Sequence, residues 1–193
     1  MNGRRRAWCQ ALALGCAGAW LPVPGRAHDL PPRRLIIERT PPTGLRLTYQ
    51  LDAIEALHPL LARRATRAQF LDRFGGLGES DLERALPAAR AALQSQTRLT
   101  APGGRAAAVT AWEWPPTRAW QEPLQAAAFL AQAGVADPGH AAGVSVRAQV
   151  HVPPGAARLQ IRVPPALHPL LVVHGAADQF WLTDLLPTAM LDL

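Results

Sequence analysis

The sequence has no Lys and only two Cys, and each of these shortages limits which class of protein it can belong to. It contains no Lys, so all 20 of its basic residues are Arg. Four of these lie in the first 27 residues, which hold no acidic residue, so residues 28–193 carry 16 Arg against 14 Asp and Glu. Nucleic acid is bound by a clustered excess of positive charge. The nearly balanced charge of residues 28–193 therefore argues against a nucleic acid as a partner.

Cysteine is scarce, and both cysteines, Cys9 and Cys16, lie in the leading segment. That segment starts with Arg4–Arg6, continues with a mainly apolar run over Ala7–Leu21, and ends in a stretch with Pro, Gly and finally Ala27. This order of charge, apolar run and small residues is typical of a secretory signal peptide. We expect cleavage after Ala27 and export to the periplasm. The mature chain would then have no cysteine and no disulfide.

The apolar run is too short for a membrane anchor, which needs about 20 residues. After residue 27 no stretch approaches about 18 uninterrupted apolar residues, so we expect no transmembrane segment once the signal peptide is removed. Two details stay open. Cleavage at Ala17-Gly18-Ala19 is an alternative, and Arg5-Arg6 leaves both the general secretory and the twin-arginine route available.

Motifs of enzymes are also missing. The sequence has no G-x-S-x-G, no H-E-x-x-H, no P-loop and no G-x-G-x-x-G. Gly75-Gly76-Leu77-Gly78 is rich in glycine, but it follows a segment with helical spacing, which favours a helix end or loop over a phosphate-binding turn. We therefore expect a protein without catalytic residues.

Three segments alternate between apolar and polar residues, and this pattern predicts strands with one buried face. They are residues 45–51, 144–152 and 157–163, with Pro153-Pro154-Gly155 predicted to join the last two as a hairpin. Strands wetted on one side favour antiparallel sheets. Weaker patterns predict five further strands, at residues 34–39, 97–101, 106–114, 170–174 and 179–183.

Helical patterns lie between these strands. Ser80 and Glu83 form a capping box that predicts a helix start, and Thr66–Phe74 predicts a shorter helix closed by glycine. We therefore expect a mainly β fold with helical insertions, namely an antiparallel immunoglobulin-like β-sandwich. It would be a single domain over residues 28–193, with a helical insert at about 53–96 and a further helix at about 122–133.

The junction Ala27-His28, followed by a strand pair, a helical insert and closing strands, resembles small exported immunoglobulin-like domains. Such domains precede the membrane part of HupE/UreJ-type proteins, a family associated with nickel or copper. The resemblance covers most of residues 27–184 in the order of its elements. It implies a periplasmic domain concerned with metal, although the membrane helices of that family are missing here.

All six histidines follow residue 27, and His28 would be the first residue of the mature chain. An amine and an imidazole on one residue chelate a metal, and one further imidazole completes the T-shaped site that suits copper. This arrangement resembles the sites of periplasmic CopC-type copper carriers, which add an Asp and a His close together. Asp137 and His140 offer that pair, spaced by three residues instead of two, and His151 is a further candidate ligand.

Two interpretations of function remain open at this point. The first is a periplasmic accessory protein that binds copper through His28. The second is a metal-free periplasmic β-sandwich that binds an envelope or membrane protein as an interaction module. Trp112 and Trp114 would share one face of a strand, with Glu113 on the other, and serve either core packing or an exposed platform for a partner.

Overall fold

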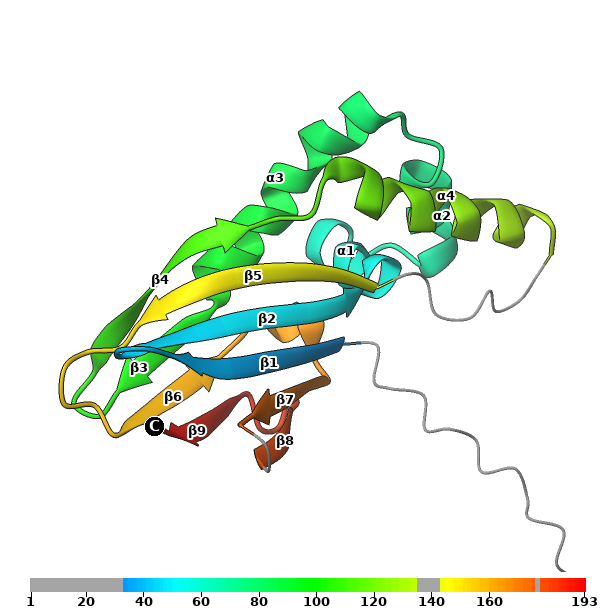
Figure 1. Ribbon diagram of the computed structural model, residues 1–193. Coiled ribbons are helices and arrows are strands. Elements are labelled where there is room, and N and C mark those ends of the chain that lie inside the picture. The colour runs from blue at the N-terminus through cyan, green and yellow to red at the C-terminus, as the bar shows by residue number, and fades with distance from the viewer. Residues whose placement is uncertain (1–32, 135–142, 176–177) are drawn as a thin grey trace, which may run out of the picture. The chain divides into compact units, whose positions relative to one another are not determined.

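The computed structural model describes residues 33–134, 143–175 and 178–193 (Figure 1). The predicted signal peptide, residues 1–27, lies outside these ranges. The described strands are β1 (Arg33–Thr40), β2 (Gly44–Asp52), β3 (Arg98–Ala101), β4 (Arg105–Glu113), β5 (Gly143–His151), β6 (Arg158–Arg162), β7 (Leu170–His174), β8 (Asp178–Leu182) and β9 (Thr188–Asp192). The helices are α1 (Ala53–Leu61), α2 (Arg67–Phe74), α3 (Glu79–Gln96), α4 (Thr117–Gln132) and the single 3₁₀ turn η1 (Pro165–Leu167).

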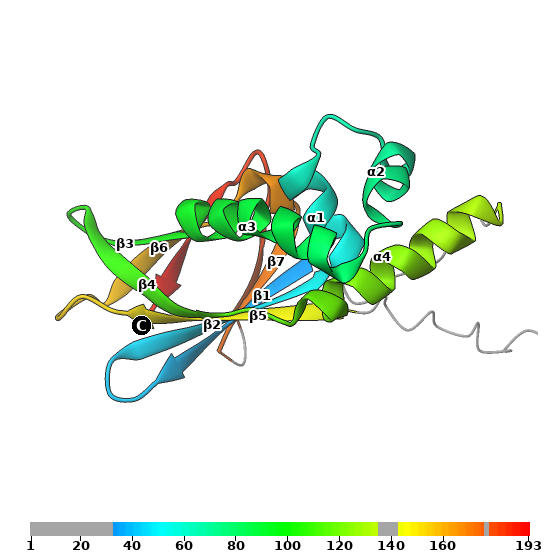
Figure 2. The ribbon, with the colours of Figure 1, turned by 90° about the horizontal axis from the view of Figure 1, so that it is seen from above.

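The strands form one sheet in the order β8-β7-β1-β2-β5-β4-β3-β6-β9. It curves, so that helices α1 and α3 lie on its concave side (Figure 2). The mainly β fold with helical insertions is confirmed. The immunoglobulin-like sandwich is not, because the nine strands follow one continuous hydrogen-bonded order. The antiparallel prediction needs a correction at one pair, since β1 and β7 run parallel.

The predicted hairpin at Pro153–Gly155 is wrong. Strand β5 pairs with β2 and β4, whereas β6 pairs with β3 and β9, so β5 and β6 are not neighbours. The β3–β4 hairpin, which turns at Gly103 and Gly104 with φ +81° at both residues, lies between them. Alternation in the sequence shows which face of a strand is buried, but it does not identify the neighbouring strand.

The concave face of the sheet carries the core. The side chains predicted to be buried on the three alternating segments are all inside, namely Leu47, Tyr49, Val146, Val150, Leu159 and Ile161. Helix α3 packs onto them through Leu82, Leu86, Ala89 and Leu93, which follow helical spacing. Burial of this apolar surface is the main stabilising contribution, since residues 28–193 contain no cysteine that could form a disulfide.

One hydrogen-bonded chain crosses this core. The hydroxyls of Tyr49 on β2 and Thr97 after α3 lie 2.8 Å apart, and Thr97 Oγ1 donates to the carbonyl of Leu93 at 2.7 Å. Both hydroxyls are buried, and each has a partner, which avoids the cost of an unsatisfied polar group. The contact fixes the end of α3 against the middle of the sheet.

Side-chain hydrogen bonds to free backbone amides cap the starts of helices α1 and α2. Thr66 and Gln69 form a capping box at α2, and Asp52 at the end of β2 accepts the amides of Ile54 and Glu55 at the start of α1. The capping box predicted at Ser80 is wrong, because α3 begins at Glu79 behind Gly78. Helix α4 begins at Thr117, directly after Pro116, and therefore starts earlier than predicted.

Candidate functional site

The predicted copper ligands are not brought together in the described part of the chain. His28, Asp137 and His140 lie outside the described residues. His151 is exposed at the end of β5, opposite Gly44 of β2. Among residues 33–134, 143–175 and 178–193, no group of three or more His, Cys, Asp or Glu side chains could hold a metal ion.

The tryptophan pair lies on the core side of β4. The strand has a bulge between Thr110 and Glu113, where Ala111 adopts φ +47°, and the residues that follow change face. Trp112 then stacks on Tyr49 and on Trp114, with ring centroids 6.4 Å and 5.6 Å apart. Both indoles are partly buried against the core, and the predicted shared face is confirmed.

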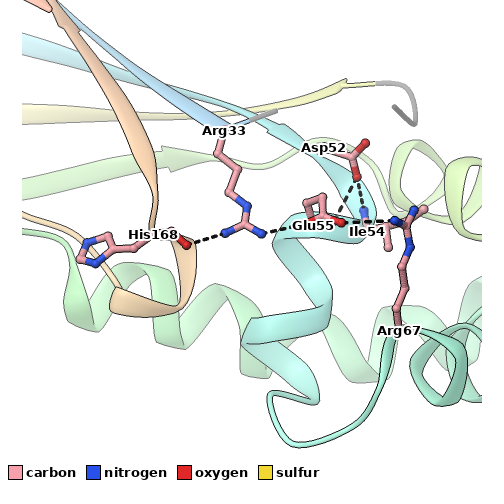
Figure 3. A network of polar contacts seen from close by, with 6 residues as sticks. All are labelled: Arg33, Asp52, Ile54, Glu55, Arg67 and His168. Atoms are coloured by element: carbon pink, nitrogen blue, oxygen red, sulfur yellow. Dashed lines mark hydrogen bonds and ion pairs between the residues drawn. The ribbon is translucent and has the colours of Figure 1, made fainter. Parts of the chain in front are cut away.

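A polar network ties the first strand to the helices (Figure 3). Arg33 on β1 donates to Glu55 of α1 at 2.8 Å and to the backbone carbonyl of His168 at 3.0 Å. Arg67 at the start of α2 lies 3.6 Å from the other oxygen of Glu55. Because the Arg33 side chain is largely buried, these contacts compensate its charge. The network has a structural role in joining β1, α1 and the segment before β7.

The convex face of the sheet carries charges that balance one another. A shallow hollow of about 450 Å³ there is lined by polar side chains of β1, β2, β4 and β5. Arg46 lies opposite Glu38 in the strand register, and Arg147 lies 3.8 Å from Glu113. Paired and exposed charges of this kind show no excess of one sign that would select a charged ligand.

A different surface stands out at β8 and β9. Four large apolar side chains are exposed there, namely Trp181 (48%), Leu185 (92%), Leu186 (67%) and Met190 (52%). We call this set the C-terminal apolar surface. Trp181 lies on β8, Leu185 and Leu186 lie in the connection to β9, and Met190 lies on β9. All four lie within residues 181–190, and contiguous exposed apolar side chains mark interaction sites more often than scattered ones do.

The connection that carries the two leucines is held in place. Thr183 and Leu186 exchange two hydrogen bonds of 3.1 Å, one from the Thr183 amide to the Leu186 carbonyl and one from the Leu186 amide to the Thr183 hydroxyl. His168 Nδ1, on a buried ring, lies 3.1 Å from a carboxylate oxygen of Asp184. The leucines are thus presented to solvent by a connection whose backbone is fixed, which reduces the entropy lost on binding.

The β8 side of this surface is acidic. Residues 163–193 contain Asp178, Asp184 and Asp192 but no Arg. Asp178 begins β8 and Asp184 lies two residues after its end, both with exposed carboxylates. Asp192 is paired with Arg158 at 2.8 Å. Arg158 and Arg162 of β6 are exposed beside β9, so the charge favours a basic partner on the β8 side of the surface alone.

Sequence reasoning missed this surface. Strand β9 was not predicted, and Leu185-Leu186 between Asp184 and Pro187 looks like a short apolar run of the core. No helix in the described part of the chain is long and apolar enough to cross a bilayer. Comparison with protein-family models, with curated proteins and with solved structures finds no significant match to this chain.

Proposed function

We propose that this chain is an exported, non-enzymatic interaction module of the periplasm that binds an envelope or membrane protein through the C-terminal apolar surface. The observation that carries the proposal is the exposure of Leu185 and Leu186 at 92% and 67% on a fixed connection. Each Leu side chain that a partner buries gains about 1.5–3 kcal/mol. Leaving two of them in water is costly unless they serve an interface.

The proposed location in the periplasm rests on the predicted signal peptide, residues 1–27. The immunoglobulin-like resemblance belongs to the proposal in the same way, as the suggestion that this is an accessory domain of the cell envelope. What supports a protein as the ligand is the nature of the surface, which combines large apolar side chains with acidic groups at its rim.

Copper binding through His28 is the second candidate function. The strand register supports a site in which His140, and not His151, is the second imidazole. Arg33 of β1 pairs with Leu51, and Gly143 of β5 pairs with Asp52, so both strands begin at the same end of β2. His28 and His140 precede these two strand starts by five and three residues. His151 lies at the other end of β5, about 25 Å from Gly143 at 3.2–3.4 Å per residue. This separation favours His140 as the second imidazole.

The experiment that tests the interaction module is site-specific photo-crosslinking in the envelope of the native cell. A photoreactive residue replaces Leu185 in one variant and Phe129 in the other. Phe129 on α4 is the matched control, because it is apolar and 70% exposed but lies on a different element. The proposal expects one defined protein to crosslink from position 185 and not from position 129. Equal crosslinking from both positions, or none from 185, would overturn it.

A further inference from the structure

The edge of β8 offers a second kind of contact beside the C-terminal apolar surface. In the sheet order β8 is terminal and pairs with β7 alone among the described strands. Strands at a sheet edge expose backbone donors and acceptors and can accept a further strand. Natural edges are protected by shortness, charges, prolines or bulges; β8 is five residues long and begins with Asp178, but its middle, Gln179-Phe180-Trp181, carries no charge or proline.

The neighbouring ladder shows which backbone groups of β8 face outward. The amide of Gly175 donates to the carbonyl of Ile37 in β1 at 3.5 Å. Because backbone groups alternate in direction along a strand, the N–H and C=O groups of Leu171 and Val173 also point toward β1. Val172 lies between those residues, so its backbone N–H and C=O groups point toward β8. Its partner there is Phe180. The backbone of Phe180 is thus engaged with β7.

Gln179 and Trp181 alternate with Phe180, and their N–H and C=O groups point away from β7. Thr183 is the next residue in this alternation, and its amide bonds to Leu186 on the outer side, in agreement with the assignment. The described strands supply no partner for the backbone of Gln179 and Trp181. On β9 the corresponding edge is partly covered, because the Asp192 carbonyl accepts a bond from Arg39 at 3.4 Å.

We propose that the partner contributes an extended segment that pairs with the outer edge of β8 at Gln179 and Trp181, with apolar side chains at alternate positions and a basic residue that meets Asp178. This inference rests on the proposed function and specifies its ligand. Alternate apolar side chains would lie beside Trp181, which is 48% exposed on β8. The basic residue would meet Asp178, the first residue of β8, whose carboxylate is exposed.

The same charges argue against a second copy of this chain as the occupant. Two β8 edges that paired with each other would place the carboxylates of both copies at one interface, with no Arg between residues 163 and 193 to compensate them. Like charges placed opposite each other on neighbouring strands are destabilising. A basic strand from another protein removes this repulsion and adds attraction.

The test selects short random peptides on the processed full chain and compares variants at Gln179. Gln179→Pro removes the outward N–H at an edge position that tolerates proline, and Gln179→Ala removes the same side chain but keeps the N–H. We expect selected peptides to combine alternating apolar residues with a basic residue at one end. They should bind Gln179→Ala like the parent chain and Gln179→Pro about tenfold more weakly, with a weaker affinity for Asp178→Lys as well.

Melting temperatures identify a Gln179→Pro chain that fails to fold, and in that case Asp178→Lys decides the outcome. Peptides that bind Gln179→Pro and Asp178→Lys like the parent chain would overturn the strand pairing. If these peptides still lose affinity for a Leu185→Ser/Leu186→Ser chain, the C-terminal apolar surface is the binding site, as the proposed function requires, but the partner does not pair with β8 as a strand. A selection without binders, or a parent dimer that Gln179→Pro dissociates, would also overturn the inference.

Discussion

His168 and Asp184 join the core to the proposed binding surface. The imidazole of His168 is buried beside the start of β7, and its Nδ1 lies 3.1 Å from the carboxylate of Asp184, which is exposed in the connection between β8 and β9. Asp184 immediately precedes Leu185 and Leu186. The contact therefore fixes the connection at the residue before the two most exposed side chains of the surface.

We predict that Asp184→Ala loosens this connection without unfolding the domain. Loss of one hydrogen bond to a charged group costs about 1–2 kcal/mol locally. Hydrogen exchange should become faster at the amides of Thr183 and Leu186, while the amides of β2 keep their protection. Asp192→Ala is the control, because it removes an exposed ion pair of β9. Unchanged exchange at Leu186 would show that the His168 contact does not hold the connection.

The ion pair between Arg33 and Glu55 should contribute more to stability than an exposed pair. Glu55→Ala removes the main partner of a largely buried guanidinium, and we expect a loss of about 1–2 kcal/mol. Asp81→Ala removes an exposed partner of Arg84 on α3 and should cost about 0.5 kcal/mol or less. Thermal unfolding of the two variants measures the difference. Equal melting temperatures would contradict the structural role of the network in Figure 3.

The only tyrosine of the chain makes one pH effect directly measurable. Burial raises the pKa of Tyr49, and the hydrogen bond with Thr97 opposes this only in part. The unfolded chain ionises near pH 10, while the folded chain keeps its proton, so stability is unaffected below about pH 10 and falls as the pH rises above it. Tyrosinate absorbance should appear together with unfolding. Ionisation near pH 10 in the folded protein would contradict the buried position.

Copper binding has a test of its own. The terminal amine and the imidazoles must lose their protons to ligate, so Cu(II) affinity should fall below about pH 6.5. His28→Ala and a tag placed before His28 should both abolish most of the affinity of the correctly processed chain, and His140→Ala should weaken it more than His151→Ala. If His28→Ala binds Cu(II) as tightly as the parent, the copper site is wrong and the interaction module remains.

Period-2 alternation in the sequence predicted β2, β5 and β6 with the correct buried faces, because that pattern depends on local geometry alone. Strand neighbours could not be predicted in the same way, and the hairpin proposed at Pro153–Gly155 failed because the β3–β4 hairpin lies between β5 and β6. The C-terminal apolar surface was missed for a related reason. Whether Leu185 and Leu186 are covered depends on the path of β9, which the sequence did not show.

The affinity of the purified partner identified by crosslinking tests the central claim most directly. It is titrated against the parent chain, the Leu185→Ser/Leu186→Ser chain and the Phe129→Ser chain. If the C-terminal apolar surface is the interface, the double variant should bind at least about tenfold more weakly, since losing about 1.4 kcal/mol suffices, while Phe129→Ser binds like the parent. Equal affinity of the double variant and the parent, with both chains folded, would contradict the account.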